Sequence, residues 1–138
     1  MEIRNTRHAV YNINYHIVWI PKYRKKILIG KIELRLKEML YEVAENYGYE
    51  ILGMEVMPDH IHLFVSAPPR YAPADVVKKF KGVTGSKLFL EFPILRRQLR
   101  KGKIWTRSYF VGTAGTVTSR AIRKYIDEQK SRQASKDD

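Results

Sequence analysis

The sequence lacks cysteine altogether, and this absence excludes several classes of functional site. Without thiols the chain has no disulfide framework, no cysteine-ligated zinc or iron–sulfur centre and no cysteine nucleophile. Long apolar runs are missing too: the longest, such as 17–20, have the length of a strand, whereas a membrane span needs about 18 residues. The N-terminus also lacks the basic and then apolar pattern of a signal peptide. We therefore expect a cytoplasmic protein without a membrane partner.

Acidic residues are scarce, because 14 Asp and Glu stand against 26 Lys and Arg and leave a formal net charge of +12. Such an excess predicts a polyanionic partner, and nucleic acid is the usual one. The basic residues form four clusters, three of them beside aromatic residues, rather than one amphipathic helix typical of membrane binding. This distribution favours a track of phosphate contacts with rings for base stacking. The candidate DNA contacts are Lys22, Arg24, Lys78, Lys79, Lys81, Arg97 and Arg107.

Hydrophobic periodicity predicts one domain over residues 1–130, followed by a frayed polar tail over 131–138. Alternation with period two indicates four strands, at 11–20, 50–57, 60–67 and 104–111. Helical spacing indicates three helices, at 31–47, 73–88 and 117–130, although Gly82 and Gly85 weaken the pattern of the second. The remaining segments are a basic turn or short helix at 91–103 and a small-residue turn at 112–115.

The resulting order of elements, β-α-β-β-α-β-α, predicts an α+β fold. Its first six elements match the ferredoxin-like split βαβ arrangement, in which helices pack on one face of an antiparallel sheet. The seventh element is then an extra C-terminal helix. Many proteins that bind RNA or DNA share this plan, so the fold alone does not decide the function.

The sharpest local signal is the run from Asp59 to Val65, which contains two histidines one residue apart. Alternate residues of a strand point to the same face about 6–7 Å apart, so His60 and His62 can converge on one metal ion. The pattern also arises by chance, in which case both rings are hydrogen-bonded residues of a half-exposed strand. The roles of the other two histidines, His8 and His16, stay open.

The predicted last helix carries Tyr125 and Gln129, which share a helix face because they are four residues apart. The pair is either a phenol nucleophile beside an amide metal ligand or an exposed ring near an exposed amide. Other catalytic classes are excluded by missing motifs. The chain has no Walker loop and no glycine-rich dinucleotide loop, so we expect no nucleotide cofactor. Asp59 also lacks the second carboxylate that a two-metal nuclease needs.

Four segments of the chain occur in an order and spacing that resemble a known family. They are 15–24, 57–63, 105–111 and the pair Tyr125 and Gln129. Together they are similar to the single-tyrosine HUH transposases of the IS200/IS605 insertion sequences, and the resemblance extends from about Tyr11 to Gln129. By this resemblance His60, His62 and Gln129 are the metal ligands and Tyr125, on the extra C-terminal helix, is the nucleophile. Imidazole and amide ligands suit either Mg²⁺ or Mn²⁺.

The resemblance also implies the reaction and the partners. An enzyme of this family nicks and rejoins single-stranded DNA at hairpins near the ends of the insertion sequence, through a 5′-phosphotyrosine. It acts as a homodimer in which each active site is built in trans. Two alternatives stay open: a domesticated HUH nuclease that processes palindromes, and a non-catalytic RNA-binding module of the RRM type. An RRM carries aromatic residues on its central strands, where this chain has His60 and His62.

Overall fold

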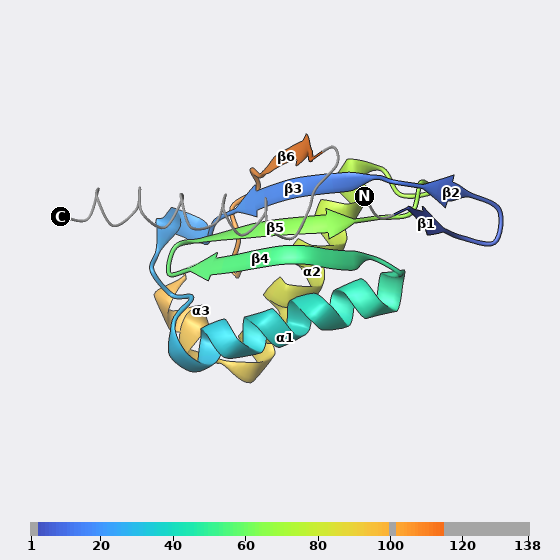
Figure 1. Ribbon diagram of the computed structural model, residues 1–138. Helices are drawn as coiled ribbons and strands as arrows, with labels where there is room; N and C mark the ends of the chain where they lie inside the picture. The colour runs from blue at the N-terminus through green and yellow to red at the C-terminus, as the bar shows by residue number, and fades with distance from the viewer. Residues whose placement is uncertain (1–2, 100–101, 115–138) are drawn as a thin grey trace.

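The described part of the computed structural model, residues 3–99 and 102–114, contains a four-stranded sheet, a two-stranded sheet and three α-helices (Figure 1). The helices are α1 (Gly30–Tyr47), α2 (Pro73–Glu91) and α3 (Ile94–Gln98), with a 3₁₀ turn, η1, at Lys22–Arg24. The strands of the larger sheet are β3 (Asn14–Trp19), β4 (Glu50–Met57), β5 (His60–Ser66) and β6 (Phe110–Thr113). The smaller sheet pairs β1 (Arg4–Asn5) with β2 (Val10–Tyr11).

The larger sheet is antiparallel throughout, with the strand order β4-β5-β3-β6. The helix α1 connects β3 to β4, α2 follows β5, and both helices lie against the same face of the sheet (Figure 1). This is the ferredoxin-like split βαβ arrangement, so the predicted fold class is confirmed. The predicted helix at 117–130 and the tail at 131–138 lie outside the described residues.

Alternation along β3 and β5 gives the sheet two different faces. One set of alternate residues packs beneath the helices, and four of its members, Ile17, Trp19, Ile61 and Leu63, are at most 1% exposed. From α1 the core receives residues at helical spacing, namely Leu36, Met39, Leu40 and Val43. The other alternate residues of the two strands point to the opposite face, and these include three histidines. Over the residues described, no helix has the length and apolar content needed to cross a membrane.

Glycine ends one helix and is accommodated inside the other. Gly48 follows α1 with a φ of 73°, and its backbone N–H donates to the Ala44 carbonyl, which closes the helix. In α2 the helix continues through Gly82 and Gly85. A Cβ atom on Gly85 would lie 3.5 Å from the Trp105 indole, which is ordinary van der Waals contact, so that ring packs directly on the helix at this residue.

The predicted strand at 104–111 is wrong over most of its length, because β6 begins only at Phe110. Ile104 and Trp105 are both buried in the core. Trp105 instead forms an isolated bridge with Pro21. The next three backbone carbonyls accept hydrogen bonds from the Lys81 ammonium group at 2.6, 3.3 and 3.3 Å, and they belong to Thr106, Arg107 and Ser108. These carbonyls are therefore withdrawn from strand pairing.

Two other boundaries differ from the prediction. The first strand of the large sheet begins at Asn14 rather than at residue 11, because Tyr11 belongs to β2 and pairs with Arg4. The predicted turn at 112–115 is wrong at its start, where Gly112 lies in β6 opposite His16. The sequence pattern did not show either change, because alternation continues from one sheet into the other and a small residue in an edge strand resembles a turn.

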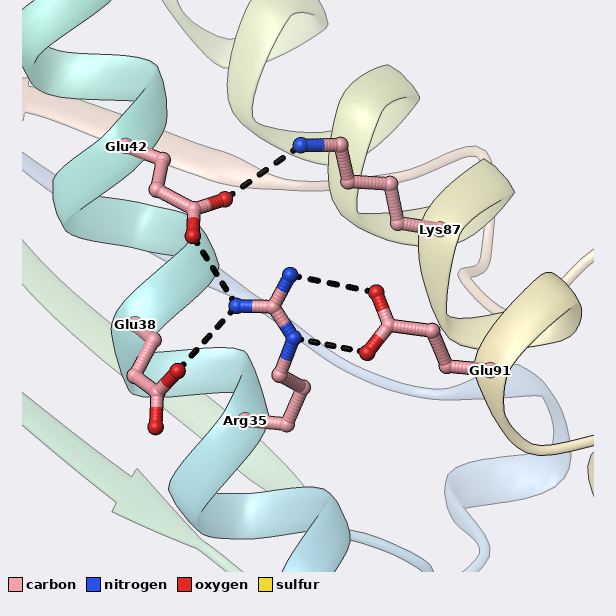
Figure 2. Close-up of polar contacts among 5 residues, drawn as sticks. All are labelled: Arg35, Glu38, Glu42, Lys87 and Glu91. Carbon is pink, nitrogen blue, oxygen red and sulfur yellow. Dashed lines mark hydrogen bonds and ion pairs between the residues drawn. The ribbon is translucent and has the colours of Figure 1, made fainter.

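Five charged side chains join α1 to α2 (Figure 2). Arg35 on α1 donates to both carboxylate oxygens of Glu91, at 2.6 Å from Nε and 3.1 Å from Nη2. Its Nη1 atom donates to Glu42 at 2.9 Å and to Glu38 at 3.2 Å. Lys87 on α2 pairs with Glu42 at 3.3 Å. Hydrogen bonds from Arg35 hold the pKa values of Glu42 and Glu91 below their ordinary values.

Replacing Arg35 with methionine is expected to lower the free energy of unfolding by about 1 kcal/mol, because one guanidinium group serves three carboxylates. Lys37→Met is the matched control, since within the described residues Lys37 makes one ion pair, to Glu33 of the same helix at 2.8 Å. That pair is of the i,i+4 kind and is expected to contribute about 0.3–0.5 kcal/mol. Urea denaturation measures both values. Equal destabilisation by the two changes would show that the network adds nothing to an ordinary pair.

Candidate metal-binding site

His60 and His62 lie at the start of β5, on the face of the sheet opposite the helices. Ile61, between them, is buried in the core, so both imidazoles point the other way. Their ring centroids are 5.0 Å apart and their planes are nearly perpendicular, at 82°. The His60 side chain is 12% exposed and His62 is 7% exposed. The strand thus brings together the two rings that the sequence pattern singles out.

Asp59 and Arg24 hold the His60 ring from outside. The Nδ1 atom of His60 lies 2.7 Å from the Asp59 carboxylate, which also accepts a hydrogen bond from Arg24 Nε at 3.0 Å. Burial alone would raise the pKa of Asp59, but the hydrogen bond from His60 and the charge of Arg24 lower it below its ordinary value. The ionised carboxylate therefore accepts the Nδ1 proton of His60, which leaves the lone pair of Nε2 as the one this ring could offer to a metal ion.

The backbone of η1 has unusual φ angles at the residues that bring Arg24 into contact with Asp59. Tyr23 and Arg24 have φ values of 59° and 49°, in the left-handed region that residues with a side chain seldom occupy. Such conformations persist only where the surrounding structure compensates for their cost, and they gather at functional sites. The two residues follow Pro21 and Lys22, and Lys22 is fixed by a backbone hydrogen bond to the Ile104 carbonyl.

His16 is the member of the cluster that the sequence left undecided. It lies on β3, where it pairs in register with Phe64, and its Nε2 atom is 3.1 Å from Nδ1 of His62. Its ring stacks on Phe64 at 4.4 Å with an angle of 6° between the planes, and Phe110 meets it edge-on at 5.7 Å. His8, by contrast, is exposed in the connection between β1 and β2.

The chemistry of these groups fits a divalent cation. Burial, together with the charges of His60 and His16, lowers the pKa of His62 to about 4, and burial also lowers the pKa of His16. Both rings are therefore neutral at pH 7, which is the state a metal ligand needs. Among residues 3–99 and 102–114, no group of three or more His, Cys, Asp or Glu could hold a metal ion, so a metal bound by the two histidines would need a ligand of another kind or one from outside these ranges. The predicted Tyr125 and Gln129 lie outside the described residues.

The candidate DNA contacts divide between two ends of the fold. The turn η1, the helix α3 and the start of β5 lie at one end, and this end carries Lys22, Arg24 and Arg97 (Figure 1). A hydrogen bond from the Lys25 ammonium group to the Gln98 carbonyl ties η1 to α3. Lys79 instead lies over the ring of Tyr47, the last residue of α1 at the opposite end, and its neighbour Lys78 is exposed.

The other two candidates, Lys81 and Arg107, line a cavity of about 390 Å³ between α2 and the segment 102–107. Lys81 is not a freely exposed cation, because its ammonium group binds three backbone carbonyls. Burial lowers the pKa of Lys81. Arg107 is exposed. The structure therefore assigns Lys81 to shaping the segment before β6 and leaves Arg107 on the surface.

Known proteins with similar sequences are transposases of one kind. The family model described as Transposase IS200 like matches residues 9–129. The ISDra2 transposase TnpA of Deinococcus radiodurans is 38% identical over 133 residues, which cover 96% of this chain and 95% of that protein. The transposase of insertion sequence element IS200 from Salmonella typhimurium is 31% identical over 126 residues, which cover 91% of this chain and 82% of that protein.

Solved structures resemble the fold as well. A crystal structure of a Deinococcus radiodurans protein assigned as a transposase has a TM-score of 0.74 and 36% identity, and the match covers 91% of this chain and 97% of that one. A REP-associated tyrosine transposase bound to a REP hairpin has a TM-score of 0.58 at 14% identity, covering 90% of this chain and 68% of that one, which shows a common fold. The family match over most of the chain, together with a histidine pair on the sheet face opposite the helices, favours the transposase over the RNA-binding module. The chain belongs to the IS200-like family of transposases, which are DNA-processing enzymes.

Proposed function

We propose that this transposase nicks and rejoins single-stranded DNA at hairpins that mark the ends of an insertion sequence, in a metal-dependent reaction. The observation that carries the proposal is the pair His60 and His62, whose rings meet on one face of β5 while each has its Nδ1 atom engaged by a neighbour. Engagement of Nδ1 directs both rings to coordinate through Nε2, as second-sphere hydrogen bonds do in metal sites.

In this proposal His60, His62 and Gln129 hold Mg²⁺ or Mn²⁺. The bound cation supplies Lewis-acid stabilisation of the charge that develops on the scissile phosphate. The Tyr125 phenol gives up its proton, its oxygen bonds to phosphorus, and the bond from phosphorus to the 3′ oxygen breaks. The leaving 3′ oxygen takes up a proton, and the 5′ phosphate stays on Tyr125. One phosphoester replaces another, so a second 3′-OH can reverse the step without ATP.

Charge and fold support a hairpin as the DNA substrate. The end of the molecule that carries His60 also carries Lys22, Arg24 and Arg97, cations able to contact a phosphate backbone. The fold relative at 14% identity is bound to a REP hairpin. Strand transfer needs two DNA ends held together, and a homodimer with its two active sites built in trans is the simplest arrangement that does so. We place the reaction in the cytoplasm, where DNA is available to the enzyme.

Metal-dependent nicking of single-stranded DNA from both flanks of the gene tests this function. We expect cleavage in Mn²⁺ or Mg²⁺ and none in a chelator. The His60→Ala protein is expected to lose cleavage below detection and to keep its hairpin affinity, because affinity depends mainly on the basic residues. His8→Ala is the control, since His8 is exposed and away from the cluster. Undiminished cleavage by His60→Ala, or cleavage in the chelator, would remove the histidines from the reaction.

A further inference from the structure

We infer that His16 is a positioning residue, which fixes the tautomer and orientation of His62 so that His62 presents Nε2 to the bound cation. The inference rests on the metal site of the proposed function. It gives a role to a histidine that lies on another strand and that the motif does not include.

The register of the sheet brings the two rings together. Val18 is opposite His62 and His16 is opposite Phe64, so His16 and His62 are diagonal neighbours on adjacent strands and on the same face. At 3.1 Å, the separation between His16 Nε2 and His62 Nδ1 is that of a hydrogen bond. Their ring centroids are 5.4 Å apart, and the planes are inclined by only 18°.

Packing holds the His16 ring in this position. Phe64 stacks on the ring and Phe110 closes in edge-on, so rotation about the side-chain bonds would break two aromatic contacts. Gly112, the residue of β6 opposite His16, makes room for Phe110. A Cβ atom there would lie 3.0 Å from Phe110 Cζ, which is tighter than most Cβ contacts and would require the Phe110 ring to shift. The glycine that the sequence suggested as a turn residue thus supports the histidine cluster.

A hydrogen bond between two ring nitrogens requires one to donate and the other to accept. If His62 Nδ1–H donates to His16, the Nε2 atom of His62 keeps its lone pair and can coordinate a metal. If His16 Nε2–H donates instead, the proton of neutral His62 is on Nε2 and coordination through that atom is blocked. Cation binding therefore requires His16 to be the acceptor, with its own proton on Nδ1.

In this arrangement His16 and Asp59 each accept the Nδ1 proton of one histidine of the pair. Asp59 accepts the Nδ1 proton of His60, and its charge is balanced by Arg24. His16 accepts the Nδ1 proton of His62 without adding any negative charge. A neutral acceptor leaves the positive charge of the cation available to a phosphate oxygen, whereas a second carboxylate at this point would reduce it.

Three substitutions separate positioning from simple packing, all in the full-length protein. His16→Phe keeps an aromatic ring against Phe64 and removes the hydrogen-bond acceptor. His16→Gln keeps an acceptor oxygen and removes the ring. His16→Leu removes the acceptor in a different shape, so the result does not depend on the folding of one variant. His8→Phe is the matched control, because it makes the same change at an exposed histidine outside the cluster.

Two measurements are made on each protein. The ¹⁵N chemical shifts of His62 in the metal-free protein report which nitrogen carries the proton, and calorimetry measures the affinity for Mn²⁺. We expect the proton on Nδ1 in the wild type and on Nε2 in His16→Phe and His16→Leu. Mn²⁺ affinity is expected to fall by about 10–100-fold in those two variants and to stay close to the wild-type value in His16→Gln and His8→Phe.

Two results would overturn the role of His16: a proton on Nε2 of His62 in the wild-type protein, or unchanged Mn²⁺ affinity in both variants that lack the acceptor. Failure of the metal site itself gives a different result. In that case the wild type does not bind Mn²⁺, while the His62 proton still moves from Nδ1 to Nε2 when His16 becomes phenylalanine. The tautomer control by His16 would then stand, and the metal dependence of the proposed function would not.

Discussion

A protein with Tyr125→Phe is expected to form no covalent DNA adduct and to lose strand cleavage completely. The change removes a single oxygen atom, the one that in our proposal bonds to phosphorus. The basic residues and the histidine cluster are untouched, so hairpin affinity and Mn²⁺ affinity are expected to stay at the wild-type level. Denaturing gels with labelled single-stranded DNA detect the adduct, and mass spectrometry of the digested protein identifies the tyrosine that carries it.

Tyr109→Phe is the matched control for this experiment. Tyr109 is a phenol directly before β6, 41% exposed, and the Lys81 ammonium group lies 5.4 Å from the centre of its ring. Its exposure makes Tyr109 a suitable competing phenol among the described residues. We expect Tyr109→Phe to form the adduct normally. DNA found on Tyr109, or an adduct that persists in Tyr125→Phe, would contradict the assignment of the nucleophile.

The fold and the histidine pair were accessible from the sequence because both depend on local periodicity. Alternation along β5 determines that Ile61 faces the core and that His60 and His62 face away from it, whatever strand lies beside them. The order of strands and helices then restricts the sheet to a small set of topologies. A local pattern was sufficient for each of these conclusions.

The role of His16 was not accessible in this way, because it depends on register. The sequence places His16 on the face away from the core, but its contact with His62 requires β3 to lie beside β5 in one alignment. A shift of one residue would turn His16 to the other face. The same reasoning applies to Arg24, whose contact with Asp59 depends on two consecutive left-handed residues that no propensity predicts.

The segment before β6 shows a second reason for failure, a tertiary contact that overrides a local pattern. Residues 104–111 have the composition of a strand, yet Trp105 packs on α2 beside Gly85 and donates a hydrogen bond to the Thr84 hydroxyl at 3.1 Å. Lys81, which the charge pattern assigned to DNA, instead binds the carbonyls of this segment. Counting charges could not separate cations that face solvent from one that the fold uses.

Mixing two inactive proteins is expected to restore cleavage if the active sites are built in trans. One protein carries His60→Ala and the other Tyr125→Phe. In a mixed dimer with trans sites, one site combines both changes and the other combines an intact histidine pair with an intact tyrosine. About half of the dimers in an equimolar, fully exchanged mixture are mixed, so about one quarter of the sites are intact. If each site is built within one chain, no site in any dimer is intact.

Two controls make the mixing result decisive. Different affinity tags on the two proteins and a sequential pull-down show that subunits have exchanged before activity is measured. A protein with both changes, mixed with His60→Ala, contains no intact tyrosine opposite an intact histidine pair and is expected to stay inactive. Recovery of about a quarter of wild-type cleavage supports trans sites, because no other pairing of these chains yields a complete site. No recovery after confirmed exchange would place the tyrosine and the histidine pair of each site in the same chain, and the chemistry proposed for Tyr125 would be unaffected.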